Sequence, residues 1–197
     1  SDVRFVHLLL DQLEVKLGLT QRIGIECLIE EVEGLIRVEE IAASSDRIET
    51  LIFGVGDYAA SQHMPLASVG STADYPPDLW HYPRFKLTMA SRANGIAPMD
   101  GPFADFQDMP SLELEAGRAH TLGMAGKWAI HPAQVDPLQA MFTPSAERIA
   151  AARKQKAAYE AAQASGRGAI NVDGVMVDSA SIRLSQSMLD QADLLGL

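Results

Sequence analysis

The sequence predicts an α/β protein built on a parallel β-sheet, and three features of the chain lead to this prediction. Short runs of β-branched and aliphatic residues alternate four times with segments whose apolar residues recur at helical spacing. Such alternation is typical of a parallel sheet, in either a barrel or a doubly wound fold. Four units are half of a (β/α)₈ TIM barrel, and the chain opens on a helix rather than a strand. We therefore expect the C-terminal half of a barrel, with the N-terminal half absent from this sequence.

The predicted elements follow one another in a regular order. Helices are expected over 1–19, 31–44, 79–94 and 111–122, and strands over 23–29, 48–55, 96–99 and 128–130. Ser1 can cap the first helix, and Gly95 is suited to the end of the third. The stretch 58–77 is rich in Gly, Ser and Pro, which predicts an irregular loop longer than most connections. Loops of that length are often functional.

Residues 143–197 predict a small α/β appendage to a barrel domain formed by 1–142. Thr143-Pro144 is expected to start a helix, with the threonine as its cap and the proline in the first turn. Asp173-Gly174 between two alternating runs is a strong turn signal, so a hairpin is expected. The elements predicted here are a helix over 145–164, strands over 169–172 and 175–177, and a helix over 179–194.

Composition narrows the class of function. The 197 residues are 47% hydrophobic and 21% charged, as in ordinary globular proteins, with a net charge of −10. An acidic chain is not expected to bind nucleic acid or anionic membranes, because both favour basic surfaces. A local basic pocket can still bind an anionic small ligand. Because Cys27 is the only cysteine, and neither a signal-like start nor a membrane-spanning run is visible, we expect a soluble cytoplasmic protein.

Two acids, Glu30 and Asp57, each close a predicted strand. Barrel enzymes place their sites at the carboxyl ends of the strands, and Mg²⁺ is typically held by one or two carboxylates, waters and the substrate. The alternative is that both are solvent-facing loop acids. Gly54 and Gly56 favour the metal site, because they allow close approach of the backbone to a ligand, and the amides of this turn could bind an oxyanion. Tight packing of strand on helix explains the two glycines equally well, so both interpretations stay open.

Other acids are weaker candidates. Asp100, Asp105 and Asp108 flank the end of the third predicted strand and could line the rim of a substrate site. At least two of them are better explained as turn or cap residues. Gly56, Asp57 and Asp100 are the candidate substrate-binding residues. Asp178 stands where a hairpin meets a helix, so an N-terminal helix cap is its simplest interpretation.

Lys127 and His131 bracket the fourth predicted strand. The lysine could pair with a phosphate or a carboxylate, and the histidine could act as an acid or base. A structural, hydrogen-bonded histidine beside a proline is the better interpretation of His131. Trp128 is most simply a core residue.

Four segments appear in one order and carry a family resemblance. They are Ile29-Glu30-Glu31-Val32-Glu33-Gly34-Leu35, Phe53-Gly54-Val55-Gly56-Asp57-Tyr58-Ala59-Ala60-Ser61, Pro98-Met99-Asp100-Gly101-Pro102-Phe103-Ala104-Asp105-Phe106 and Gly126-Lys127-Trp128-Ala129-Ile130-His131-Pro132-Ala133-Gln134. Together they resemble the citrate lyase β-subunit-like family of CoA-ester lyases in the HpcH/HpaI aldolase superfamily, closest to the malyl-CoA and β-methylmalyl-CoA lyases. The segment 177–182 resembles the C-terminal lid of that family.

The resemblance implies a (β/α)₈ barrel with a C-terminal lid, assembled as a homotrimer or hexamer in which the lid contacts a neighbouring subunit. It implies that Glu30 and Asp57 hold Mg²⁺, or alternatively Mn²⁺, and that Asp178 moves the proton during catalysis. The implied reaction is the reversible aldol cleavage of a 3-hydroxyacyl-CoA, such as malyl-, methylmalyl- or citramalyl-CoA. The products would be an acyl-CoA and a 2-oxoacid such as glyoxylate.

This sequence departs from the family in one respect. The first half of the barrel, which carries the family's arginines for the oxoacid and much of its CoA contact, is absent. We expect the sequence to be part of a longer protein, because half a barrel would expose strand edges and core. Two other functions stand beside the lyase. One is a malyl-CoA thioesterase, in which water reaches the thioester, and the other is a non-catalytic subunit that retains the fold.

Overall fold

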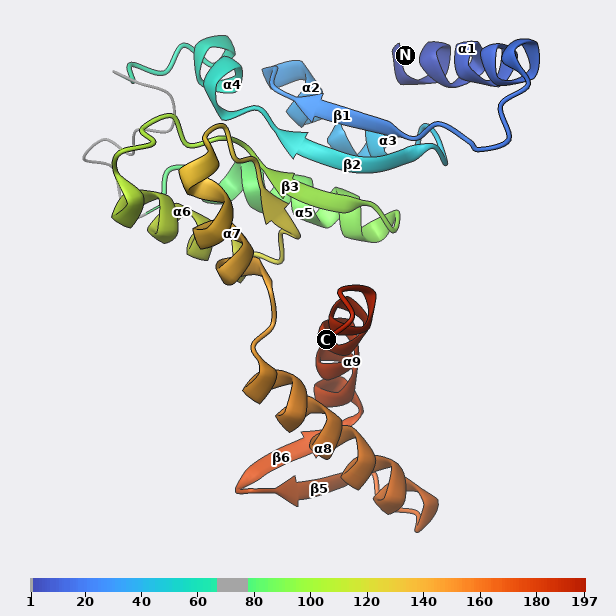
Figure 1. Ribbon diagram of the computed structural model, residues 1–197, viewed down its shortest axis with the longest axis vertical. Coiled ribbons are helices and arrows are strands. Elements are labelled where there is room, and N and C mark those ends of the chain that lie inside the picture. The colour runs from blue at the N-terminus through green and yellow to red at the C-terminus, as the bar shows by residue number, and fades with distance from the viewer. Residues whose placement is uncertain (1, 67–77) are drawn as a thin grey trace. The chain divides into compact units, whose positions relative to one another are not determined.

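A computed structural model describes residues 2–66 and 78–197 of the chain. The chain divides into two compact units, Ser1–Phe142 and Thr143–Leu197. The first unit contains a parallel sheet whose strands follow the order β1-β2-β3-β4 (Figure 1). The strands are β1 (Ile25–Ile29), β2 (Ile48–Phe53), β3 (Ala97–Asp100) and β4 (Gly126–Lys127). Because the strand order never reverses, the sheet matches part of a barrel rather than a doubly wound fold, as predicted.

The first unit contains helices before, between and after its strands. They are α1 (Asp2–Leu17), α2 (Val32–Ile36), α3 (Val38–Ala42), α4 (Val55–Ser61), α5 (His81–Ala93), α6 (Met109–Thr121) and α7 (Val135–Phe142), with a 3₁₀ turn at Pro132–Gln134. α5 packs on β2 and β3, and α6 packs on β4 and α7 (Figure 1). Leu51 and Phe53 of β2 and Leu87 of α5 are fully buried between these layers. Within residues 2–66 and 78–197, no helix combines the length and apolar character needed to cross a membrane.

Some predicted boundaries in the first unit are wrong. The helix predicted over 31–44 is divided into α2 and α3, because the backbone of Arg37 leaves helical geometry at φ −106° and ψ 20°. The loop predicted over 58–77 begins later than expected, since residues 55–61 form α4 and bury Val55, Tyr58 and Ala59. The part of that loop over 67–77 lies outside the described residues.

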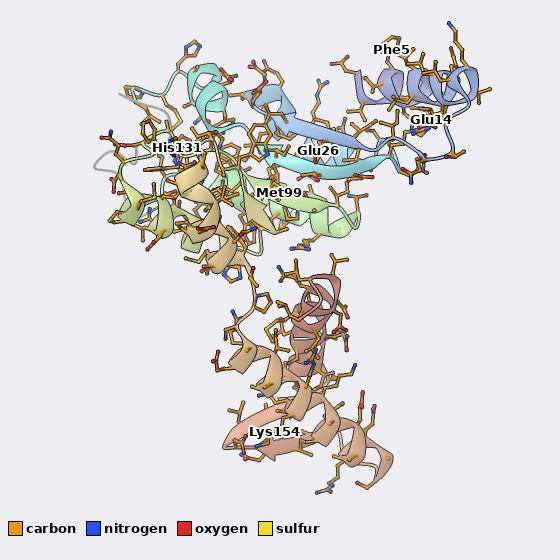
Figure 2. All side chains as sticks on the ribbon, viewed as in Figure 1. Phe5, Glu14, Glu26, Met99, His131 and Lys154 are labelled. Atoms are coloured by element: carbon orange, nitrogen blue, oxygen red, sulfur yellow. The ribbon has the colours of Figure 1, made fainter. Side chains whose placement is uncertain are left out.

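The fourth strand lies two residues earlier than predicted. β4 is Gly126–Lys127, with Gly126 opposite Met99 of β3, which is labelled in Figure 2. A side chain at Gly126 would come within 2.7 Å of the Met99 Cε atom, so the strand approaches β3 at a residue with little strand propensity. Trp128 follows the strand and is 37% exposed, so its assignment to the core is wrong.

The second unit contains two helices and an antiparallel hairpin. Its elements are α8 (Ala146–Ala164), β5 (Ala169–Val172), β6 (Val175–Asp178) and α9 (Ser179–Leu194). The predicted hairpin is confirmed, because Asp173 and Gly174 both have positive φ, at 52° and 85°, as a type I′ turn requires. Ser145, and not Thr143, caps α8 by accepting a hydrogen bond from the Arg148 amide at 3.3 Å. The role of this unit as a lid or oligomerisation segment stays a prediction.

Ionic contacts attach α1 to the rest of the first unit. The Arg47 guanidinium, whose side chain is 2% exposed, donates to Asp11 at 2.5 Å and to Glu14 at 2.6 Å. The hydrogen bond from Arg47 lowers the pKa of Glu14 to about 2. By contrast, Phe5 and Val15 of the same helix are 68% and 84% exposed (Figure 2 labels Phe5). Polar contacts with Arg47 therefore contribute much of the interaction that holds α1 on the first unit.

We expect Arg47→Met to release α1 at neutral pH. Because the pKa of Glu14 is lowered in the folded state, its stabilising contribution is present above its ordinary value of 4.5 and is lost as the pH falls toward about 2. Wild-type α1 should therefore lose amide-exchange protection over that pH range, and the variant should lack the protection already at pH 7. Arg22→Met removes an exposed pair with Asp46 and is the matched control, which should keep α1 protected. If the amides of α1 were equally protected in Arg47→Met and Arg22→Met, Arg47 would not be what attaches this helix.

Candidate active site at the carboxyl ends of the strands

Glu30 and Asp57 meet at one edge of the sheet. Glu30 directly follows β1, and Asp57 lies in the first turn of α4, which follows β2. The two strands are parallel, with Ile29 opposite Phe53, so both chains leave the sheet at the same edge. The Gly54 amide donates a hydrogen bond to the Ile29 carbonyl oxygen at 3.0 Å, which holds the residues that follow β1 next to those that follow β2. The structure therefore brings together the two acids proposed from the sequence.

The electrostatics of this pair suit a cation. Burial raises the pKa of Glu30, and the charge of Asp57 together with a hydrogen bond to it raises this pKa further. Two carboxylates this close repel each other when both are ionised, and a divalent cation between them relieves that repulsion. No group of three or more His, Cys, Asp or Glu residues is placed to hold a metal within the described part of the chain. A two-carboxylate site suits Mg²⁺, which keeps several waters and also uses oxygens of its substrate.

Two glycines allow the backbone to pack closely beside these acids. A Cβ atom on Gly54 would overlap the Glu30 side chain, and one on Gly101 would overlap the Phe53 carbonyl oxygen. Gly54 thus serves tight packing, one of the two interpretations left open by the sequence. Gly56 lies in the first turn of α4, and its predicted contact with substrate stays a prediction.

Asp100 belongs to a buried network of charges. Its carboxylate accepts hydrogen bonds from the Arg84 Nε at 2.9 Å and from the Lys127 Nζ at 2.6 Å. Arg84 also pairs with Glu115 at 2.8 Å, and all four side chains are no more than 3% exposed. Burial alone raises the pKa of Asp100, but the charges of Lys127 and Arg84 outweigh burial and lower it. A substrate contact by Asp100 stays a prediction, and the structure shows both of its oxygens committed to Arg84 and Lys127.

Sequence reasoning missed Arg84 and Glu115. Both look like surface charges of helices when taken singly. A signal was available, because Arg84 lies four residues after the buried Trp80 and three before Leu87, and Glu115 stands between Leu112 and Ala119 at the same helical spacing. A charged residue on a buried helix face implies a buried partner.

The remaining candidates near this edge have structural roles. Asp105 accepts a hydrogen bond from the Gln107 amide, and Asp108 caps α6 by accepting from the Ser111 amide. This confirms that two of the three acids are turn or cap residues. His131 accepts from the Ala133 amide at 3.2 Å and stacks on Phe106 with ring centroids 4.6 Å apart (Figure 2 labels His131). The structural interpretation of His131 is therefore confirmed.

Asp178, in the second unit, caps α9. Its Oδ1 atom accepts hydrogen bonds from the amides of Ala180 and Ser181 at 3.0 and 2.9 Å and from the Ser181 hydroxyl at 3.0 Å. The hydrogen bonds from Ser181 lower the pKa of Asp178. The cap interpretation is confirmed, and it uses one carboxylate oxygen. The catalytic role stays a prediction.

Known proteins similar to this chain span nearly all of it. The L-malyl-CoA/beta-methylmalyl-CoA lyase of Cereibacter sphaeroides is 40% identical over 99% of this chain and 64% of its own length. The (3S)-malyl-CoA thioesterase of the same organism is 32% identical over 92% of this chain and 61% of its own length. This chain therefore spans less than two thirds of the length of either relative.

Solved structures show the same fold. A citrate lyase from Burkholderia xenovorans is 28% identical with a TM-score of 0.76, over 93% of this chain and 57% of its own. The protein CitE from Mycobacterium tuberculosis, in complex with magnesium, acetoacetate and coenzyme A, is 29% identical with a TM-score of 0.69, over 89% of this chain and 63% of its own. The family model described as HpcH/HpaI aldolase/citrate lyase matches residues 2–132. With two thirds of its residues inside that model, the chain belongs to the HpcH/HpaI aldolase/citrate lyase family.

Proposed function

We propose that this protein is a Mg²⁺-dependent CoA-ester lyase that reversibly cleaves a 3-hydroxyacyl-CoA to an acyl-CoA and a 2-oxoacid such as glyoxylate. One observation carries the proposal: Glu30 and Asp57 lie together at the carboxyl ends of two adjacent parallel strands, with the pKa of Glu30 raised. Family membership and the lyase that is 40% identical support the same chemistry. The similar CitE structure contains magnesium and coenzyme A, which supports the choice of cofactor and substrate.

Glu30 and Asp57 would hold the metal, and their carboxylates would leave positions for waters and for the 2-oxoacid. When bound, Mg²⁺ or Mn²⁺ supplies Lewis-acid polarisation of the carbonyl group of the oxoacid. Gly56, in the first turn of α4, would offer its amide to an oxygen of the substrate. The close packing of Gly54 on Glu30 would fix the direction from which the carboxylates reach the metal.

Asp178 would act as the acid–base residue of the reaction. Its carboxylate is oriented by three hydrogen bonds to one of its oxygens, which leaves the other oxygen for the substrate. In the proposed assembly, a homotrimer or hexamer, the second unit acts as a lid and brings this residue to the site of a neighbouring subunit.

Asp178→Asn should lower kcat by about 10²- to 10⁴-fold while leaving the Mn²⁺ dissociation constant unchanged. Asparagine caps a helix as well as aspartate does, so α9 should keep its start, but the amide cannot take up a proton. Ser145→Ala is the matched control, because it removes the cap of α8 in the same unit and leaves Asp178 unchanged. It should cost about 1 kcal/mol of stability and little activity. Wild-type turnover in Asp178→Asn would remove this residue from the mechanism.

A thioesterase is the second candidate, because one relative is named a (3S)-malyl-CoA thioesterase. Purified protein incubated with malyl-CoA distinguishes the functions by the products. A lyase releases glyoxylate and acetyl-CoA, and EDTA stops the release. A thioesterase releases free CoA and malate without glyoxylate. Neither set of products, together with an absence of Mg²⁺ binding, would indicate a non-catalytic subunit.

A further inference from the structure

We propose that Lys127 is a positioning residue for the Glu30–Asp57 site: it holds the loop after β3 against the backbone segment that presents Asp57. This inference rests on the proposed function, in which these two carboxylates bind the metal. Lys127 itself is not placed to meet a substrate, because its side chain is 2% exposed.

The first step is the attachment of Lys127 to the end of β3. Its ammonium donates to the Asp100 carboxylate at 2.6 Å and to the Gly101 carbonyl oxygen at 2.8 Å. Charge-assisted hydrogen bonds in a buried site are short and directional, so they fix the position of Gly101. Gln134, fully buried, fixes the same loop two residues later by donating to the Phe103 carbonyl at 2.9 Å.

The second step is the contact of Gly101 with the end of β2. A Cβ atom on Gly101 would overlap the Phe53 carbonyl oxygen and lie 3.3 Å from the Val55 amide nitrogen. The two backbones therefore touch without an intervening side chain. A displacement of Gly101 must be transmitted to 53–55, the segment from which α4 begins.

The third step leads from this segment to the two carboxylates. Gly54 lies between Phe53 and Val55, packs directly on the Glu30 side chain and accepts the first hydrogen bond of α4 from the Tyr58 amide at 3.0 Å. Asp57 lies within that turn. The separation of the two carboxylates thus depends on where this backbone is held, and metal sites tolerate errors of only about 0.5 Å.

The test compares Lys127→Met with Arg47→Met in the whole protein. Both variants remove a cation whose side chain is 2% exposed in the first unit, but Arg47 precedes β2 and lies at the opposite edge of the sheet. The Mn²⁺ dissociation constant is measured by electron paramagnetic resonance, with the melting temperature recorded in parallel. We expect at least a tenfold weaker affinity in Lys127→Met and a change of less than twofold in Arg47→Met, although both lose stability.

A second variant tests the contact sterically. Gly101→Ala should weaken Mn²⁺ binding similarly, whereas Gly34→Ala, where the added Cβ meets only Ile29 at 3.8 Å, should not. Unchanged affinity in a folded Lys127→Met protein would overturn the inference. If that variant does not fold, unchanged affinity in Gly101→Ala overturns it.

A readout without metal separates this inference from the proposed function. The backbone amide signals of Gly54 and Gly56 in NMR spectra should move in Lys127→Met and stay in place in Arg47→Met. If wild-type protein binds no Mn²⁺, the proposed function fails, and these signals still decide whether Lys127 positions the segment. If the Gly54 and Gly56 signals do not move in Lys127→Met, the positioning role of Lys127 is rejected, whether or not the protein binds Mn²⁺.

Discussion

Asp57→Asn should abolish binding of Mg²⁺ and Mn²⁺ without destabilising the metal-free protein. The pKa of Glu30 is raised by burial and by the charge and hydrogen bond of Asp57, so the folded state favours protonated Glu30. Because the pKa of Glu30 is higher in the folded state, the folded protein becomes less stable as the pH rises above 4.5, the ordinary pKa of this carboxyl, and through the raised pKa. Neutral asparagine removes the repulsion, and the metal-free variant should melt at the wild-type temperature or above it at pH 7. The proposed cleavage of malyl-CoA should be lost as well.

Melting curves with and without Mg²⁺ measure this prediction. A ligand at 100 times its dissociation constant stabilises the folded protein by about 2.7 kcal/mol, so wild-type protein should melt at a higher temperature with Mg²⁺. The variant should show no such increase. Asp105→Asn is the matched control, because the Asp105 carboxylate accepts a hydrogen bond from the Gln107 amide in the turn after β3, and this variant should respond to Mg²⁺ as wild type does. A wild-type response in Asp57→Asn would remove this residue from the metal site.

Arg84→Met should cause the largest loss of stability in the first unit. It would leave the buried carboxylates of Asp100 and Glu115 without the guanidinium that pairs with both of them. Removal of one partner from a buried ion pair costs about 3–5 kcal/mol, because an uncompensated charge remains. We expect the melting temperature to fall by roughly 10 °C.

Thermal unfolding of Arg84→Met beside Arg92→Met provides the measurement and its control. Arg92 lies on the same helix, but it is exposed and donates one hydrogen bond to the Gly123 carbonyl. Its replacement should change the free energy of unfolding by no more than about 0.5 kcal/mol. If Arg84→Met and Arg92→Met have the same melting temperature, the buried charge network of Arg84 does not stabilise the first unit.

The sequence predicts the position of the candidate site because local rules decide it. Glu30 and Asp57 follow apolar strand runs, and the carboxyl ends of parallel strands share one edge. The hairpin at Asp173-Gly174 and the start of α9 at Asp178 are equally local, since each depends on one turn or one cap. Such features can be predicted without knowing which residues pack against them.

The features that the sequence does not predict depend on contacts between distant elements. The sequence does not predict the position of β4, because Gly126 is a poor strand former and its close approach to Met99 is what places it in the sheet. The partners of Asp100 come from α5 and β4, 16 residues before it and 27 after it along the chain. Periodicity could mark Arg84 as a buried position, but only packing selects its partner.

The position of bound Mn²⁺ would show directly whether Glu30 and Asp57 are the metal ligands. Crystals of the protein containing Mn²⁺ give an anomalous difference peak at the ion. We predict one peak between Glu30 and Asp57, with a carboxylate oxygen of each about 2.1 Å away as in hard-metal sites. A peak elsewhere, or none at a Mn²⁺ concentration that supports cleavage, would contradict the assignment of these two acids as the metal ligands.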